Sequence, residues 1–338
     1  MKSDISALEQ LRLEMANTRE DAVATWHACN DAAAAAAGYA RSAGRLVLLG
    51  MGGSHWMNIA AVPQYRAVGL DATAEVLSSF MRMPQIGQPA VFLTSQSGES
   101  GEVVRFLDTH GDPRAIFGLT LAPQSTLARR TTALIGQGGQ EKSYAATRSL
   151  IVTLAIHARI LGHLGLDTSA FEAALETDID VNLGAAVARL RHCDNAVLVA
   201  RGASQGMADA AALSFMELAR VPVLALEAGQ FRHGPFEMID AKTAIIMLRG
   251  QGPEGDNIDG LARECLHFGL QPVIFDYSGG DPVEGCINVM LPACSGLAAV
   301  TTVLPVLQRA IVDAAALMVT NPGAPVRSTK VTSAEAAG

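Results

Sequence analysis

The chain has 338 residues, 49% hydrophobic and 17% charged, so it is long enough for two domains with apolar cores. Its formal net charge of −8 argues against general nucleic-acid binding, and no uninterrupted apolar run approaches the roughly 20 residues that span a membrane. The N-terminus lacks the basic-then-apolar pattern of a secretion signal, and the five cysteines include no Cys-x-x-Cys pair. We therefore expect a cytoplasmic protein with reduced thiols, without a metal site and with neither a nucleic-acid nor a membrane partner.

The first half alternates short apolar runs with helical patterns. Residues 1–43 predict a helical arm of one or two helices, used for packing or dimerisation. The run Arg45–Gly50 predicts a buried strand, followed by a glycine turn at 51–54 and a helix over about 55–68. Strands near 72–76, 89–94, 114–119 and 133–136, with a short helix at 125–130, complete the pattern. Strands that are apolar throughout and alternate with helices indicate a parallel sheet covered on both faces.

The strand, glycine turn and helix at 45–68 also admit a dinucleotide-binding interpretation, with Glu75 at a suitable distance downstream. The spacing Gly50-x-Gly52 would then require glycine at position 55, where the chain has His55. A second ligand-facing loop at the carboxyl edge of the same sheet is the simpler interpretation.

A serine-rich loop follows the third apolar strand. Its sequence, residues 95–100, is Ser-Gln-Ser-Gly-Glu-Ser, and a helical pattern begins at Gly101. The unpaired N–H groups and the dipole of a helix start favour an anion, and the serines add hydroxyl donors. The loop has no lysine and no Gly-x-x-x-x-Gly-Lys-Ser/Thr pattern, so a single phosphate monoester fits better than a nucleoside triphosphate. An ordinary serine-rich turn that caps a helix is the alternative.

The second half repeats this plan after a connection at about 165–184, whose acidic run at 176–180 is most simply a solvated helix face. Strands are predicted near 196–200, 221–226, 244–248, 273–275 and 286–291, and a long apolar helix over 297–319. The turn after 244–248 has no serine loop. The chain is thus predicted to be a duplicated α/β unit in which only the first copy keeps the phosphate loop.

Three places in the second half suggest chemistry. Glu217 lies in an otherwise apolar helix, where a carboxylate suits a general base, or else ends the helix half solvated and paired with Arg220. His233 precedes Gly-Pro in a loop and is either a proton donor and acceptor or a turn residue. The tail at 321–338 ends its Pro-rich part with Lys330, which would supply a cation if the tail folds over a site.

These motifs occur in the order and rough spacing of the sugar isomerase (SIS) family, which the chain resembles from about Arg45 to Thr332. They comprise the serine loop, Glu141 with Ala145-Ala146-Thr147-Arg148, Glu217, Phe231-Arg232-His233-Gly234-Pro235, and Arg327-x-x-Lys330-Val331-Thr332. Within the family the chain is similar to the isomerase half of glucosamine-6-phosphate synthase and to free-standing amino-sugar-phosphate deaminases and deglycases. The resemblance implies tandem SIS domains over 44–165 and 185–320, each a parallel sheet flanked by helices on both faces.

The resemblance also implies roles for individual residues. Glu217 would transfer the proton between C1 and C2. His233 would open the sugar ring, reaching the site of the partner subunit in a homodimer, and Lys330 would assist ring opening as the tail closes the site. The remaining residues would bind the substrate, with the phosphate on the first four and the sugar on the rest: Ser95, Gln96, Ser97, Ser100, Gly53, Ser54, Tyr144, Ala146 and Thr147.

The chain departs from the synthase at Ser214, where the synthase has a second active-site lysine, and residues 1–43 are too few for a glutamine-hydrolysing domain. The expected function is therefore isomerisation or deamination of an amino-sugar or ketose 6-phosphate, without a cofactor. The alternatives are a fructosamine-6-phosphate deglycase and a non-catalytic regulator that binds a sugar phosphate.

Overall fold

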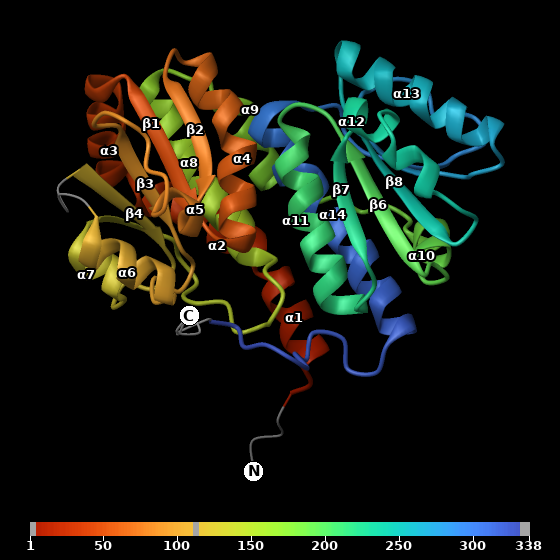
Figure 1. Cartoon of the computed structure of the whole chain (residues 1–338), viewed down its shortest axis with the longest axis horizontal. Helices are drawn as coiled ribbons and strands as arrows, with labels where there is room; N and C mark the ends of the chain where they lie inside the picture. The colour runs from red at the N-terminus through yellow and green to blue at the C-terminus, as the bar shows by residue number, and fades with distance from the viewer. Residues whose placement is uncertain (1–4, 111–114, 332–338) are drawn as a thin grey trace. The chain divides into compact units, whose positions relative to one another are not determined.

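The computed structural model describes residues 5–110 and 115–331, which fall into two compact units (Figure 1). The first sheet belongs to the unit made of Glu9–Leu175 and Pro325–Gly338, and the second sheet to the unit made of Met1–Leu8 and Glu176–Ala324. The arm from Glu9 onwards and the tail from Pro325 onwards thus belong to the same unit as the serine loop.

The first unit contains a five-stranded parallel sheet in the order β2-β1-β3-β4-β5. The strands are β1 Arg45–Gly50, β2 Asp71–Val76, β3 Ala90–Thr94, β4 Ile116–Thr120 and β5 Thr132–Ile135. The fourth strand was predicted from Arg114, a residue outside the described part of the chain. Alternate side chains of these strands are buried on opposite faces, which is why the sheet needs helices on both sides.

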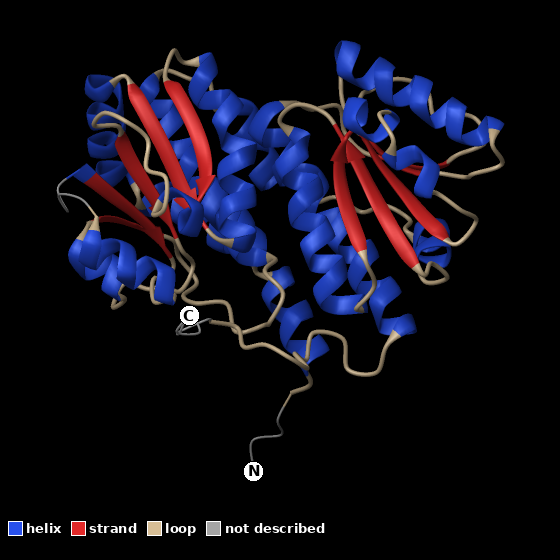
Figure 2. Ribbon diagram, in the orientation of Figure 1, coloured by secondary structure: helices blue, strands red, loops and turns tan. Residues whose placement is uncertain are grey.

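Helices cover both faces of this sheet (Figure 2). One face packs against α5 Leu77–Phe80, α6 Gly101–Thr109 and α7 Thr126–Arg130 through a cluster that includes Leu93 and Phe106. On the other face, Tyr39 packs on Phe117 and Tyr65 on Phe92. That face is covered by α3 Asn30–Ala43, α4 Gly52–Ala67 and α8 Arg148–Leu164.

The arm contains three helices among its described residues, where one or two were predicted. They are α1 Ala7–Ala16, α2 Thr18–Ala28 and α3. The single Asn17 and Cys29 that separate them interrupt an otherwise helical stretch, so the breaks leave little trace in the sequence. Both α2 and α3 pack on α8, which makes the arm part of the layer that covers the first sheet.

The second unit repeats the topology with the order β10-β9-β8-β6-β7, also parallel. Its strands are β6 Asn195–Ala200, β7 Val223–Glu227, β8 Thr243–Arg249, β9 Val273–Asp276 and β10 Ile287–Met290. Its helices are α10 Gly184–Leu190, α11 Ser204–Ala219, α12 Ala228–Arg232, α13 Gly252–His267 and α14 Gly296–Met318, with a short 3-10 helix at Pro235–Met238. In the opposite direction the order is β7-β6-β8-β9-β10, which matches the order of the first sheet strand for strand. The predicted duplication of a parallel α/β unit is therefore confirmed.

The helix α9 Ser169–Glu176 closes the first unit. In the acidic run at 176–180, the acidic side chains are exposed, but only Glu176 is helical, so the prediction of a solvated helix face was wrong about the helix. The helix α14 is long and apolar enough to cross a membrane, yet 83% of its most apolar window is buried within the protein, as in a core helix.

Candidate functional site

The serine loop, residues 95–100, connects β3 to α6, as predicted. Ser95 and Ser97 are buried, at 9% and 7% exposure. Their Oγ atoms accept hydrogen bonds from the N–H groups of Gly98 and Glu99, at 3.1 and 3.3 Å, so each hydroxyl keeps its hydrogen for another acceptor. Inward-facing hydroxyl donors at a helix start suit a phosphate.

Two further features of the serine loop favour an anion. The Ser100 side chain does not cap α6 although Ser100 is its N-cap residue, so the first N–H groups of the helix receive no side-chain acceptor from it. The Nε2 atom of Gln96 is buried and finds no hydrogen-bond partner among the described residues. A buried amide donor is costly to leave unmatched, and a bound phosphate oxygen would match it.

The loop's own carboxylate is already engaged. Glu99 accepts hydrogen bonds from the N–H and the Oγ1 of Thr126, at 2.6 and 2.9 Å. Gly98 has φ +62°, and a side chain there would overlap Ser125. Glycine therefore allows both the left-handed turn and the close approach of this loop to the start of α7.

Gly53 and Ser54 lie in the first turn of α4 rather than in a loop, because the helix begins at Gly52 and not near His55. A Cβ atom on Gly53 would stand 2.9 Å from Leu150 Cδ2 and 3.4 Å from the Cβ of Ala146. The fold thus brings together two residues for which a sugar-binding role is predicted, and a side chain at Gly53 would displace the end of the Leu150 side chain.

The segment 137–147 ends at α8 and carries Tyr144, Ala146 and Thr147, for which sugar binding is predicted. We name it the substrate loop after this prediction. Glu141 is 3% exposed and organises this segment. Its Oε1 accepts from the Thr147 N–H and Oγ1, both at 2.9 Å, and from the Arg148 N–H at 2.8 Å, and Ser149 Oγ donates to its Oε2. Glu141 therefore satisfies donors at the start of α8 from within the loop.

The described part of the tail contacts this loop. Lys330 Nζ lies 3.6 Å from Oε2 of Glu141 and donates to the Tyr144 carbonyl at 3.3 Å, while Tyr144 Oη pairs with Ser328 Oγ. Lys330 is therefore brought together with Tyr144 in the same unit as the serine loop. Thr332, the last residue of the tail motif, lies outside the described residues.

Glu217 and His233 belong to the other unit. Glu217 is half-buried, two residues before the end of α11. Arg220, the residue expected to pair with it in the alternative interpretation, takes a left-handed conformation and donates to the carbonyls of Asn321 and Ala324. His233 is exposed at the C-terminal end of α12, and its N–H bonds to the Gln230 carbonyl.

Ser214, the departure from the synthase pattern, is 2% exposed. Its Oγ donates to the Ala210 carbonyl and accepts from Gln308 Nε2, both at 3.1 Å. Ser214 therefore serves the packing of α11 against α14.

Asp209, for which the sequence predicts no role, lies on α11 two turns before Glu217. Burial raises the pKa of Asp209 to about 6, despite a hydrogen bond from Gln205 Nε2. The sequence pattern that could have identified Asp209 is the one that identified Glu217, a carboxylate in an otherwise apolar helix. Asp209 is a second titratable group on α11.

The second unit has a cavity of about 80 Å³ in the position that corresponds to the serine loop of the first. Residues after β6, β8 and β9 and before α14 line it, among them Arg201, Ser204, Gly250, Glu254, Tyr277 and Ser295. One cationic and one acidic side chain line this cavity, and no run of serines does.

Among the described residues, no group of three or more His, Cys, Asp or Glu side chains is arranged to hold a metal ion. In the first unit the serine loop offers hydroxyl and amide donors, and Lys330 lies beside Tyr144 and Glu141. Such donors suit an anionic or hydroxylated ligand.

Comparison with known proteins shows what the chain is similar to. Residues 189–316 match the SIS domain. The chain is 23% identical over 257 residues to glutamine--fructose-6-phosphate aminotransferase of Haemophilus influenzae, a match that covers 68% of this chain and 42% of that protein. It is 26% identical over 218 residues to the protein of that name from Sulfolobus acidocaldarius, covering 62% and 37%. The chain thus matches about two fifths of the length of these relatives.

Similarity to solved structures extends over more of the chain. The C-terminal domain of glucosamine-fructose-6-phosphate aminotransferase from Francisella tularensis superposes with a TM-score of 0.79 at 16% identity, covering 94% of this chain and 98% of that one. Tagatose-6-phosphate ketose/aldose isomerase from Escherichia coli gives 0.78 at 16% identity, covering 93% and 94%. Glucosamine-6-phosphate deaminase from Thermotoga maritima gives 0.73 at 16% identity, covering 95% and 99%. The chain therefore contains an SIS domain at 189–316 and shares the tandem α/β fold of these phosphosugar enzymes.

Proposed function

We propose that the chain acts on an amino-sugar 6-phosphate, converting glucosamine 6-phosphate and water to fructose 6-phosphate and ammonia. The observation that carries this proposal is the serine loop, with its two buried hydroxyls and the unmatched amide of Gln96 at the start of α6. A phosphate monoester matches these donors, and the hydroxyl and carbonyl groups of the substrate loop suit a sugar.

The reaction needs a proton moved between two neighbouring carbons. His233 assists opening of the sugar ring, which frees the C1 aldehyde. Glu217 then removes the proton from C2 to form an enolamine and returns it to C1, which leaves an imine at C2. Water adds to this imine and ammonia departs, so that the C2 ketone of fructose 6-phosphate remains. Lys330 supplies a positive charge for the oxyanion that develops at C1.

The fate of nitrogen follows from Ser214. A lysine at that position could hold the substrate as an imine with the protein, whereas a buried serine engaged with Gln308 cannot. Hydrolysis of a free imine therefore suits this chain better than transfer of an amide nitrogen. The same proton transfer without nitrogen would be a simple aldose–ketose isomerisation.

We also propose that the protein is a cytoplasmic homodimer, in which His233 acts in the site of the partner subunit. The exposed position of His233, at the end of a five-residue helix, supports a role outside its own domain.

The test is to incubate the purified chain with glucosamine 6-phosphate and to follow ammonia and fructose 6-phosphate together. Both products should appear in equal amounts, and Glu217→Gln should lower kcat by about 100-fold or more, because an amide cannot accept the proton. Asp209→Asn is the matched control, since it removes another half-buried carboxylate from the same helix and should retain most of the activity.

Three outcomes would contradict the proposal. Normal turnover by Glu217→Gln would make that residue structural, and loss of activity only in Asp209→Asn would move the base to Asp209. Absence of turnover, with thermal stabilisation by the sugar phosphate, would favour a regulator or another reaction such as deglycation, which a panel of phosphosugars would distinguish.

A further inference from the structure

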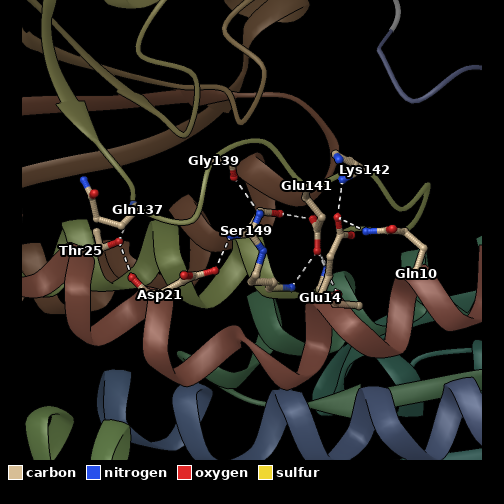
Figure 3. Close-up of polar contacts among 11 residues, drawn as sticks. Gln10, Glu14, Asp21, Thr25, Gln137, Gly139, Glu141, Lys142 and Ser149 are labelled. Carbon is tan, nitrogen blue, oxygen red and sulfur yellow. Dashed lines mark hydrogen bonds and ion pairs between the residues drawn. The ribbon is translucent and has the colours of Figure 1, made fainter. Parts of the chain in front are cut away.

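The N-terminal arm holds the substrate loop by its backbone (Figure 3). Glu14, on α1, accepts from the N–H of Lys142 through one carboxylate oxygen at 2.6 Å and from the N–H of Ser143 through the other at 2.9 Å. Both donors lie between Glu141 and Tyr144. A residue 128 positions away in the sequence therefore fixes the backbone immediately before the predicted sugar-binding residues.

The environment of Glu14 shows that it is an ionised acceptor. It is 6% exposed, and Gln10 Nε2 donates to its Oε1 at 2.9 Å. Burial alone would raise the pKa of Glu14, but hydrogen bonds from Ser143, Lys142 and Gln10 together hold it below the usual value. At neutral pH the carboxylate accepts only, and each of its oxygens serves a different backbone donor.

Further attachments lie at the start of the substrate loop and at its junction with α8. Thr25 Oγ1 accepts from the Gln137 N–H at 2.8 Å, and Asp21 forms an ion pair of 2.5 Å with Arg148, which is 3% exposed. The same Arg148 donates to the Gly139 carbonyl at 2.7 Å. The helices α1 and α2 thus contact the loop near its start, its middle and its junction with α8.

The residues next to the two amides held by Glu14 contact Lys330 of the tail. Ser143 precedes Tyr144, whose carbonyl accepts from Lys330, and Glu141, which lies 3.6 Å from Lys330, precedes Lys142. A shift of the two amides held by Glu14 would move both partners of Lys330. The serine loop also has support from β4 and α7, since Ser95 N–H bonds to the Leu119 carbonyl and the Glu99 carboxylate accepts from Thr126. One side-chain hydrogen bond, from Gln140 Nε2 to the Ser97 carbonyl at 3.3 Å, joins it to the substrate loop.

We propose that Glu14 is a positioning residue for the sugar end of the site, which sets the place of the substrate loop and of Lys330 without touching the substrate. The inference rests on the proposed function, because it takes the substrate loop as the sugar-binding segment. It assigns the N-terminal arm a role in substrate recognition beyond packing.

Glu14→Gln tests this role with little change in shape. A glutamine can accept one of the two N–H groups through its oxygen, but its NH₂ group then faces the other N–H and leaves that buried donor unmatched. We expect the dissociation constant for glucosamine 6-phosphate, measured by calorimetry with Glu217→Gln present in every protein to prevent turnover, to rise about 10-fold or more, since small misplacements in a site have large effects. Binding of inorganic phosphate should be unchanged, because the serine loop stays in place.

Glu20→Gln is the matched control. It makes the same chemical change at an exposed position of the same arm, on α2, and should bind both ligands as the unmodified chain does. Ala36→Gly in α3 is a control for stability, since glycine in place of a buried helical alanine lowers the melting temperature without altering the loop contacts.

A second pair of variants tests the other attachment. Gly138 and Gly139 both have positive φ, +81° and +69°. A Cβ on Gly138 would overlap the Asp21 carboxylate and the Arg148 guanidinium, whereas a Cβ on Gly139 would have no atom within 4 Å. Gly138→Ala should therefore weaken sugar-phosphate binding more than Gly139→Ala, which carries the backbone strain alone.

The results separate the two proposals. Equal weakening of sugar-phosphate and inorganic-phosphate binding in Glu14→Gln, or no change in either, would overturn the positioning role. If the unmodified chain binds phosphate but no phosphosugar, the proposed function fails, and amide hydrogen exchange then decides the inference. Exchange at Lys142 and Ser143 should be faster in Glu14→Gln and not in Glu20→Gln, and unchanged exchange would overturn the role of Glu14.

Discussion

Burial sets the protonation state of His157, which is fully buried in α8. Its Nδ1 lies 3.0 Å from Tyr65 Oη and its Nε2 3.1 Å from Asn58 Oδ1. The same Asn58 oxygen accepts from Thr94 Oγ1 at 2.9 Å, one residue before the serine loop. This network matches a neutral imidazole that donates to Asn58 and accepts from Tyr65, and burial lowers the pKa of His157 to about 3.

The lowered pKa predicts a loss of stability in acid. Below the ordinary value of 6.5 the unfolded chain binds a proton at His157 that the folded chain refuses, so the free energy of unfolding falls as pH drops from 6.5 towards 3. The contribution is about 1.4 kcal/mol per pH unit, and above pH 6.5 it is absent. Denaturant unfolding between pH 7 and 5 measures it.

The control is His157→Gln, because a glutamine can donate to Asn58 and accept from Tyr65 without titrating. The burial of His55 lowers its pKa as well, so both forms should lose some stability, and the difference in slope belongs to His157. Identical slopes in the two proteins would show that His157 does not account for the pH dependence.

At the scale of elements, the helix start and the loop before it make the proposed phosphate site. The loop can pass close to α7 only because Gly98 has φ +62° and no side chain, since a Cβ there would stand 2.6 Å from the Cβ of Ser125. The geometry of the serine loop therefore depends on one residue that donates nothing to the ligand.

Gly98→Ala should weaken binding of inorganic phosphate about 10-fold or more and lower stability by about 1–2 kcal/mol, the usual cost of a left-handed non-glycine residue. Gly69→Ala is the matched control, because Gly69 also has positive φ, +89°, and its Cβ would have no atom within 4 Å. It should lower the melting temperature without changing phosphate binding. Equal phosphate affinity in both variants would mean that the close approach at Ser125 does not shape the site.

At the scale of the whole molecule, the proposed dimer predicts complementation between inactive variants. If Glu217 of one subunit works with His233 of its partner, a mixed dimer of Glu217→Gln and His233→Ala has one site with both original residues. Mixing the unfolded variants in equal amounts and refolding them should restore about a quarter of the original activity, since half of the dimers are mixed and each has one competent site of two.

The control is each variant refolded alone, which should stay inactive. A mixture with no more activity than its components would show that Glu217 and His233 act from the same chain, or that the protein works as a monomer. Sedimentation of the unmodified chain gives its oligomeric state independently.

Much of the fold follows from local sequence. Apolar runs such as Arg45–Gly50 and Asn195–Ala200 can be satisfied only inside a sheet covered on both faces, so the two parallel sheets and the serine loop at a strand end were predictable. Element boundaries were less certain. The start of α4 at Gly52 was predicted too late, because a glycine-rich helix start carries no helical periodicity. The breaks between the helices of the arm are single residues and were therefore missed.

The contacts that complete the site were decided by tertiary structure. Neither Glu14 nor Asp21 lies in a recognisable motif, and from the sequence an acidic residue on a helix is expected to be solvated. In the fold, Glu14 instead contacts two backbone amides and Asp21 contacts Arg148. The meeting of Lys330 with Tyr144, 186 residues earlier, likewise depends on where the chain returns. Local sequence determined the sheets, the serine loop and the residue types suited to phosphosugar chemistry, because these depend on periodicity and composition. The tertiary structure decided which carboxylates hold the loop, because hydrogen-bond partners far apart in sequence are chosen only by folding.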